Sequence, residues 1–198
     1  MAVDRRERRR QQLLVAARAV FADKGYPGAT VDDIVARVPV ARGTFYLYFE
    51  DKLDVFRALV DAFFERLTEC IESIDVEDPE RLPRAQLEAN LRRVVRLALE
   101  EPAMVKIALS DATGMDRALD AQLNLFYEAL QTYMDESLEI GQAIGLVREG
   151  DRRIMLAVAL GGFKELLLGA VTGAMDRTEE EIVKAMVAFL EHGLLADI

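Results

Sequence analysis

Residues 30–52 read TVDDIVARVPVARGTFYLYFEDK, and this stretch decides the fold of the N-terminal part of the chain. Thr30 is followed by acidic residues in the pattern of a capping box, so we expect a short helix of about two turns to begin there. Pro39 ends this helix, because proline lacks the backbone N–H that a continuing helix needs. A third short helix is expected from about Ala41 to Tyr46, and its apolar residues, including Phe45, should turn inward.

Two short amphipathic helices joined by a tight turn behind a basic first helix follow the helix-turn-helix plan. In that plan the outer face of the third helix enters the major groove of DNA. Arg42 carries five donors suited to guanine or phosphate, and the tyrosine hydroxyls and the Lys52 ammonium suit phosphate oxygens. The residues that we predict to contact double-stranded DNA are Thr30, Val31, Arg42, Gly43, Thr44, Tyr46, Tyr48 and Lys52.

The charge of the chain is unevenly distributed. Its net charge is −10, yet residues 1–50 hold nine Lys and Arg against six Asp and Glu, and the remainder carries −13. A basic segment at residues 1–50 followed by an acidic remainder indicates that only the N-terminal segment binds a polyanion. Arg5–Arg10 should then add phosphate or minor-groove contacts. On charge alone, a solvated arginine tail explains the same pattern.

The remaining pattern is helical throughout, with apolar residues three and four apart. The first helix should stop at Gly25, and Asp51 should cap a long fourth helix. Further helices are expected at about 87–99, 102–109 and 117–141, with a loop at Gly114, then a helix that opens at Asp151 and another at about 178–196. The fold class is therefore all-α with about nine helices, divided into a three-helix DNA-binding domain at 1–52 and a larger helical ligand-binding and dimerisation domain at 53–198.

Composition excludes several classes of protein. With 52% hydrophobic and 30% charged residues, the chain is neither disordered nor of low complexity. The single cysteine, Cys70, and the single histidine, His192, leave no disulfide framework and no cluster of metal ligands, so we expect no metal and no cofactor. The longest apolar stretch, 154–171, is interrupted by two charges and is short for a bilayer. We therefore expect a cytoplasmic protein without membrane contact.

Residues 41–59, ARGTFYLYFEDKLDVFRAL, resemble the signature of TetR-family transcriptional regulators, in which a Gly-Thr-Phe-Tyr-x-Tyr-Phe core precedes an acidic residue and a lysine. The resemblance covers about residues 10–60. It implies a DNA-binding regulator, most simply a repressor, rather than an enzyme. Two departures affect the turn before the third helix: Pro39 stands where glycine is common, and Ala41 stands where serine often caps the helix.

The resemblance also implies that the C-terminal domain binds a small hydrophobic effector in a cavity. The residues that we expect to line this cavity are Phe63, Leu67, Met104, Phe126, Tyr127, Leu130, Phe163, Lys164 and Leu166. Ordinary core packing explains apolar helical stripes equally well. Lys164 and Glu165 are the only charges across 154–171, and they either face the cavity or form an interface ion pair. A regulator controlled by a protein partner is the alternative function, and an enzyme on a helical bundle is a more remote one.

Small residues recur at multiples of four in the eighth helix, a spacing that lets another helix approach closely. This helix is apolar nearly all round, so it must be covered on every side. We expect a four-helix bundle between two copies of the chain, while a single-chain core with the same pattern remains the alternative. The expected interface residues are Ala157, Gly161, Gly169, Gly173, Ile182, Met186 and Phe189.

Overall fold

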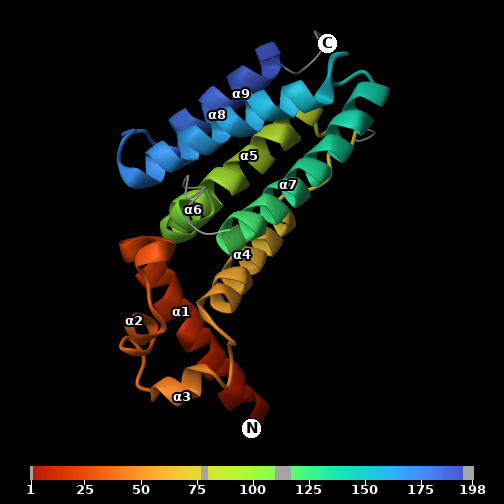
Figure 1. The fold of residues 1–198 in the computed structure, drawn as a ribbon. Helices are drawn as coiled ribbons and strands as arrows, with labels where there is room; N and C mark the ends of the chain where they lie inside the picture. Colours follow the sequence, from red (N-terminus) through yellow and green to blue (C-terminus); the bar gives the residue numbers. More distant parts are fainter. Residues whose placement is uncertain (1, 77–79, 110–116, 194–198) are drawn as a thin grey trace. The chain divides into compact units, whose positions relative to one another are not determined.

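A computed structural model describes residues 2–76, 80–109 and 117–193, and the predicted loop at Gly114 and helix end near residue 196 lie outside them. Within these residues the regular structure consists of nine α-helices and no strand, which confirms the all-α prediction (Figure 1). The helices are α1 (Ala2–Gly28), α2 (Val31–Val35), α3 (Arg42–Phe45), α4 (Lys52–Glu69), α5 (Pro83–Glu100), α6 (Pro102–Leu109), α7 (Arg117–Ala143), α8 (Arg152–Thr172) and α9 (Glu179–Gly193).

The chain divides into two compact units. Unit 1 comprises Met1–Glu65 and Ala103–Asn124, and unit 2 comprises Arg66–Pro102 and Leu125–Ile198. Unit 1 therefore contains α1, α2, α3, most of α4, and α6, whereas unit 2 contains α5, most of α7, α8 and α9. The functional division at residue 52 remains a prediction.

The core of the helix-turn-helix is aromatic. Phe21, Tyr26 and Phe56 form a triangle of rings whose centroids lie 5.1–5.8 Å apart. Gly25 takes a φ of 69°, a left-handed conformation that side-chain-bearing residues disfavour, and it interrupts α1 where the sequence predicts a stop. The interruption turns the chain so that Tyr26 can reach the ring of Phe56 on α4.

Side chains fix where α2 and α4 begin. The Thr30 hydroxyl accepts a hydrogen bond from the Asp33 backbone N–H at 3.1 Å, and the Asp33 carboxylate accepts one from the Thr30 N–H at 3.0 Å. The predicted capping box is thus confirmed. The Asp51 carboxylate accepts a hydrogen bond from the Asp54 N–H at 2.8 Å, which confirms its expected role as cap of α4.

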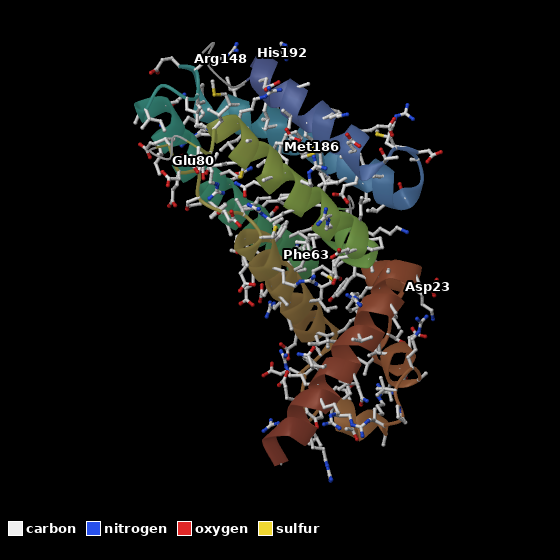
Figure 2. All side chains as sticks on the ribbon, turned by 180° about the vertical axis from the view of Figure 1, so that it is seen from behind. Asp23, Phe63, Glu80, Arg148, Met186 and His192 are labelled. Carbon is white, nitrogen blue, oxygen red and sulfur yellow. The ribbon has the colours of Figure 1, made fainter. Side chains whose placement is uncertain are left out.

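In unit 2, α9 packs along α5, and both helices contact α8 (Figure 1). Arg96 on α5 and Glu179 on α9 form an ion pair at 3.1 Å. Met186 is 1% exposed and lies on α9 (Figure 2). The apolar side of α9 therefore faces the interior of unit 2. Its buried residues are Ile182, Val183, Met186, Val187 and Leu190.

Two buried amide side chains of α5 hold the segment that follows α4. Asn90 accepts from the Glu72 N–H at 2.9 Å and donates to the Glu72 carbonyl at 2.8 Å. Gln86 accepts from the Asp75 N–H at 2.8 Å and donates to the Asp75 carbonyl at 2.7 Å. These amides satisfy backbone groups that have no helical or strand partner, so the extended segment is fixed to α5.

The starts of α8 and of α9 follow the sequence prediction. Asp151 caps α8 by accepting from two backbone N–H groups, and Gly173 ends it with a φ of 78°. The Thr178 hydroxyl accepts from the Glu181 N–H at 3.3 Å, and the Glu181 carboxylate accepts from the Thr178 N–H at 2.8 Å. This second capping box gives the polypeptide a defined turn between the two helices.

Candidate functional site

The short helix α3 exposes its polar residues on one side and buries the aromatic residue Phe45 on the other. Phe45 is 0% exposed and its ring lies 5.7 Å from that of Phe49. The next residue, Tyr46, is 49% exposed. Arg42 and Gly43 are exposed, and Thr44 is half-buried. The predicted DNA-contacting residues of α3 therefore lie on one accessible element that is fixed by its apolar side.

The turn before α3 closes without glycine. The Val40 N–H donates to the Val38 carbonyl at 2.7 Å, which reverses the chain around Pro39 without any positive φ there. Ala41 occupies the cap position with extended backbone angles and provides no side-chain hydrogen bond. Both departures from the family signature are thus accommodated by the backbone alone.

Arg42 is held by a neighbour on another helix. Its Nη1 donates to Oδ2 of Asp32, in the first turn of α2, at 3.0 Å. A hydrogen bond to the Tyr46 side chain, followed by the charge of Asp32, raises the pKa of the Arg42 guanidinium. The guanidinium is held on the side of Asp32. Sequence reasoning did not predict this contact, because a pairing across ten residues leaves no local pattern.

Lys52 is engaged inside the protein. Its ammonium donates to the carbonyls of Tyr26 at 2.8 Å and Ala29 at 3.0 Å, and it lies 4.2 Å from the centre of the Tyr26 ring. These contacts tie the end of α1 to the first residue of α4. The expectation that Lys52 serves a phosphate is difficult to reconcile with them, since two of its three donors are occupied by backbone carbonyls.

The other predicted DNA contacts lie around the same helices. Thr30 uses its hydroxyl in the cap of α2, while Val31 and Tyr48 are half-buried. On α1, the Arg10 guanidinium lies 5.3 Å from the centre of the Phe49 ring, so this arginine packs on the aromatic anchor of α3. The structure therefore brings the predicted residues together on unit 1.

The predicted effector residues are distributed over both compact units. Phe63 and Met104 belong to unit 1, where both are buried, and the other seven belong to unit 2. In unit 2, Phe126 is buried and its ring lies 5.4 Å from that of Tyr127. Lys164 is half-buried and Glu165 is exposed, as are two consecutive glycines before them. The cavity remains a prediction.

The predicted dimer residues fall into two groups. Ile182 and Met186 are each 1% exposed, so they belong to the core of the chain itself and their assignment to the interface is wrong. A Cβ added at Gly169 would lie 3.3 Å from the Cβ of Met175. The glycine therefore makes room for the Met175 side chain in the turn after α8. The residues that are exposed are Ala157, Gly161, Gly173 and Phe189.

An exposed apolar face runs along α8. Ile154 is 64% exposed and Val158 is 54% exposed. A Cβ added at Gly161 would meet nothing within 4 Å. On the opposite side of α8, Phe163 packs on Phe189 of α9 with ring centroids 6.1 Å apart. Sequence reasoning missed Ile154 and Val158, although the all-round apolar composition of this helix could have indicated them.

By length and composition alone, α8 could cross a membrane, which contradicts the expectation that this stretch is too short and too charged. Only 17% of its apolar window is buried. However, α8 packs against α5 and α9, whose outer residues include ion-paired arginines, glutamates and a lysine. A helix packed in such a charged bundle is part of a soluble helical domain rather than a membrane span.

Comparison with known proteins agrees with the helix-turn-helix. Residues 13–59 match the model of bacterial regulatory proteins of the tetR family. The chain is 27% identical over 188 residues to the uncharacterized HTH-type transcriptional regulator YdgC of Bacillus subtilis, covering 94% of this chain and 92% of YdgC. It is 28% identical over 147 residues to the HTH-type transcriptional repressor AcnR of Corynebacterium efficiens, covering 64% of this chain and 78% of AcnR.

The fold is also found in a solved structure, the transcriptional regulator FadR from Bacillus subtilis in complex with stearoyl-CoA. The TM-score is 0.74 at 22% identity, over 91% of this chain and 96% of FadR. Regulators of the tetR family, whose model matches residues 13–59, bind DNA and are not enzymes, so the function is that of a DNA-binding regulator. Residues 13–59 thus carry the DNA-binding segment of the TetR family of transcriptional regulators.

Proposed function

We propose that the protein is a cytoplasmic, homodimeric repressor that leaves its operator when a hydrophobic effector binds to its C-terminal domain. The observation that carries the DNA-binding part is α3: an exposed polar helix, anchored by a fully buried Phe45, in the segment that matches the family model. Repression is supported by the similarity to AcnR, which is named as a repressor.

The proposed DNA contacts follow from the chemistry of the exposed residues. Arg42 presents the donors that suit the O6 and N7 atoms of guanine, and the Thr44 methyl group suits thymine. The Tyr46 hydroxyl, on a side chain that is 49% exposed, suits a phosphate oxygen. Lys52 acts in this proposal through the tie between α1 and α4 and not as a primary phosphate contact.

The proposed effector contains a long acyl chain. The expected lining is almost entirely apolar, with Lys164 and Tyr127 as the polar groups that could meet a thioester or an acidic head group. FadR from Bacillus subtilis shares the fold and was solved with stearoyl-CoA, an acyl thioester. These two facts favour an acyl-CoA or a fatty acid over a polar metabolite.

The proposed dimer uses the exposed face of α8 and α9. On α8 the exposed residues are Ile154 and Val158 beside an open Gly161, and on α9 Phe189 is 41% exposed. A second copy of the same face would cover it by a symmetric four-helix arrangement. Such a dimer presents two α3 helices to one operator.

A linked titration tests the proposal. Stearoyl-CoA is added to the protein in the presence and in the absence of its operator, with unacylated coenzyme A as the control. An effector shifts an equilibrium only through different affinities for two states, so operator should weaken acyl-CoA binding by the same factor by which acyl-CoA weakens operator binding. Superimposable curves would show that the acyl-CoA does not control DNA binding. If no acyl-CoA releases the operator but a second protein does, the alternative of a regulator controlled by a protein partner is favoured.

A further inference from the structure

An exposed ion pair joins the two helices of the helix-turn-helix motif. It links Asp32, in the first turn of α2, to Arg42, the first residue of α3, at 3.0 Å. The two side chains are 65% and 61% exposed. An isolated ion pair at this exposure adds little to stability, since solvent screens it. Its place on the element that is proposed to enter the major groove points to a different use.

We propose that Asp32 is a specificity-determining residue, which holds the Arg42 guanidinium in the orientation that reads guanine. This inference rests on the proposed contact between Arg42 and DNA. Guanine is recognised by two parallel donors of one guanidinium, and this geometry requires the planar group to be fixed. Asp32 engages Nη1 alone, so other donors of Arg42 remain for the base.

Neighbouring residues make this role specific to Asp32. The adjacent Asp33 is engaged by the Thr30 cap and by the Lys24 ammonium at 2.6 Å, so it cannot replace Asp32. Tyr46, one turn along the chain from Arg42, helps to raise the pKa of the guanidinium, as Asp32 does. The contact that holds the arginine is therefore the one from Asp32 on α2.

The charge of Asp32 also acts on DNA of any sequence. A carboxylate beside the phosphates of a duplex is repelled, and this repulsion opposes binding wherever Arg42 finds no guanine. Loss of Asp32 should therefore have two opposite effects. Affinity for random DNA should rise, because one negative charge is gone, while the preference for the operator should fall, because the guanidinium is no longer oriented.

The experiment uses the full chain and a duplex library randomised over about 25 base pairs, enough for two half-sites one helical turn apart. Selection with the wild-type protein defines the operator, and binding of operator and of random duplex is then measured for each variant. The variants are Asp32→Ala, Asp32→Asn and Arg42→Ala. The control is Asp23→Ala, which removes a carboxylate from the Asp23–Arg37 ion pair of the same unit (Figure 2).

We expect Asp32→Ala to lower the ratio of operator to random affinity about fivefold or more, within the range of one bidentate base contact, and to relax the selected base at one position per half-site. Asp32→Asn keeps an acceptor and should lie between Asp32→Ala and wild type. Asp23→Ala should leave the selected sequence unchanged. Melting temperatures close to wild type check that the variants fold.

Two results would overturn the inference. One is an equal rise in affinity for operator and random DNA in both Asp32 variants, since Asp32 would then only repel phosphates. The other is a selected sequence that is unchanged in Asp32→Ala but altered in Arg42→Ala, which would leave Arg42 as a base reader without help from Asp32. If Arg42→Ala also leaves the selected sequence unchanged, Arg42 does not read a base. The proposed DNA contact on which this inference rests is then the part that is wrong.

Discussion

Helices α3 and α8 each leave one face exposed, but the chemistry of the two faces is opposite. The face of α3 carries a guanidinium, a hydroxyl and a phenol over a closed aromatic core. The face of α8 carries Ile154 and Val158, both more than half exposed, and an open glycine. Each surface needs a partner, yet the forces that bind the partners differ. The first depends on charge and the second on the burial of apolar area.

Salt should separate the two faces most strongly. If the N-terminal units of a dimer contact about 6–10 phosphates, operator affinity should fall about 10³–10⁵-fold between about 50 and 200 mM salt. Self-association through the apolar face should change little over the same range. Fluorescence anisotropy with labelled operator measures the first, and sedimentation velocity measures the second. A dimer that dissociates as salt rises would show that its interface is ionic.

The substitution Gly161→Leu should break the apolar face. An added Cβ meets nothing within 4 Å inside the chain, so the protomer should fold normally, and leucine is a better helix former than glycine. In a dimer the extra bulk would force the helices apart, at a cost of about 1–3 kcal/mol or more. Sedimentation equilibrium should show a weaker dimer.

The matched control for Gly161→Leu is Ala85→Leu, which places the same side chain at an exposed position of α5. It should leave the dimer intact. A Gly161→Leu protein that dimerises as tightly as the control would remove this face from the interface.

Lys52→Met should destabilise the helix-turn-helix. The change removes two charge-assisted hydrogen bonds to the ends of α1 and the contact with the Tyr26 ring. We expect a loss of about 1–3 kcal/mol in the free energy of unfolding, measured by urea denaturation. Lys184→Met, which removes an exposed ammonium on α9, should cost far less. Unchanged stability with weaker DNA binding would return Lys52 to the role of a phosphate contact.

Asp33 should give the smallest effect, and it depends on pH. Hydrogen bonds from Lys24 and then Thr30 lower the pKa of its carboxyl to about 2. Because the folded pKa lies below the usual value of 3.8, the stabilising contribution is complete above about pH 4 and is lost as the pH falls towards 2. The difference in urea midpoint between wild type and Asp33→Asn should shrink over that interval. A constant difference would show that the pKa is not depressed.

The sequence predicts the fold well where local chemistry sets it. Thr30, Asp51, Asp151 and Thr178 each start a helix at the predicted residue, because a cap acts within three residues of the chain. The fifth helix begins earlier than expected, at Pro83, since a proline is compatible with the first helical turn.

Sequence reasoning was less successful where residues distant along the chain meet. The Asp32–Arg42 pair and the engagement of Lys52 by Tyr26 depend on tertiary packing. Ile182 and Met186 share the apolar spacing of an interface, but α5 already buries them. Periodicity identifies an apolar face and does not identify what covers it.

In the proposed dimer, the apolar face of α8 and α9 pairs two copies so that two α3 helices bind one operator. Sedimentation of the protein with the selected duplex tests this pairing, together with a second duplex that carries about five extra base pairs, half a helical turn, between the half-sites. Two chains should bind cooperatively to the first duplex, and this cooperativity should be lost on the second. Saturation by one chain, or equal cooperative binding to both duplexes, would contradict it.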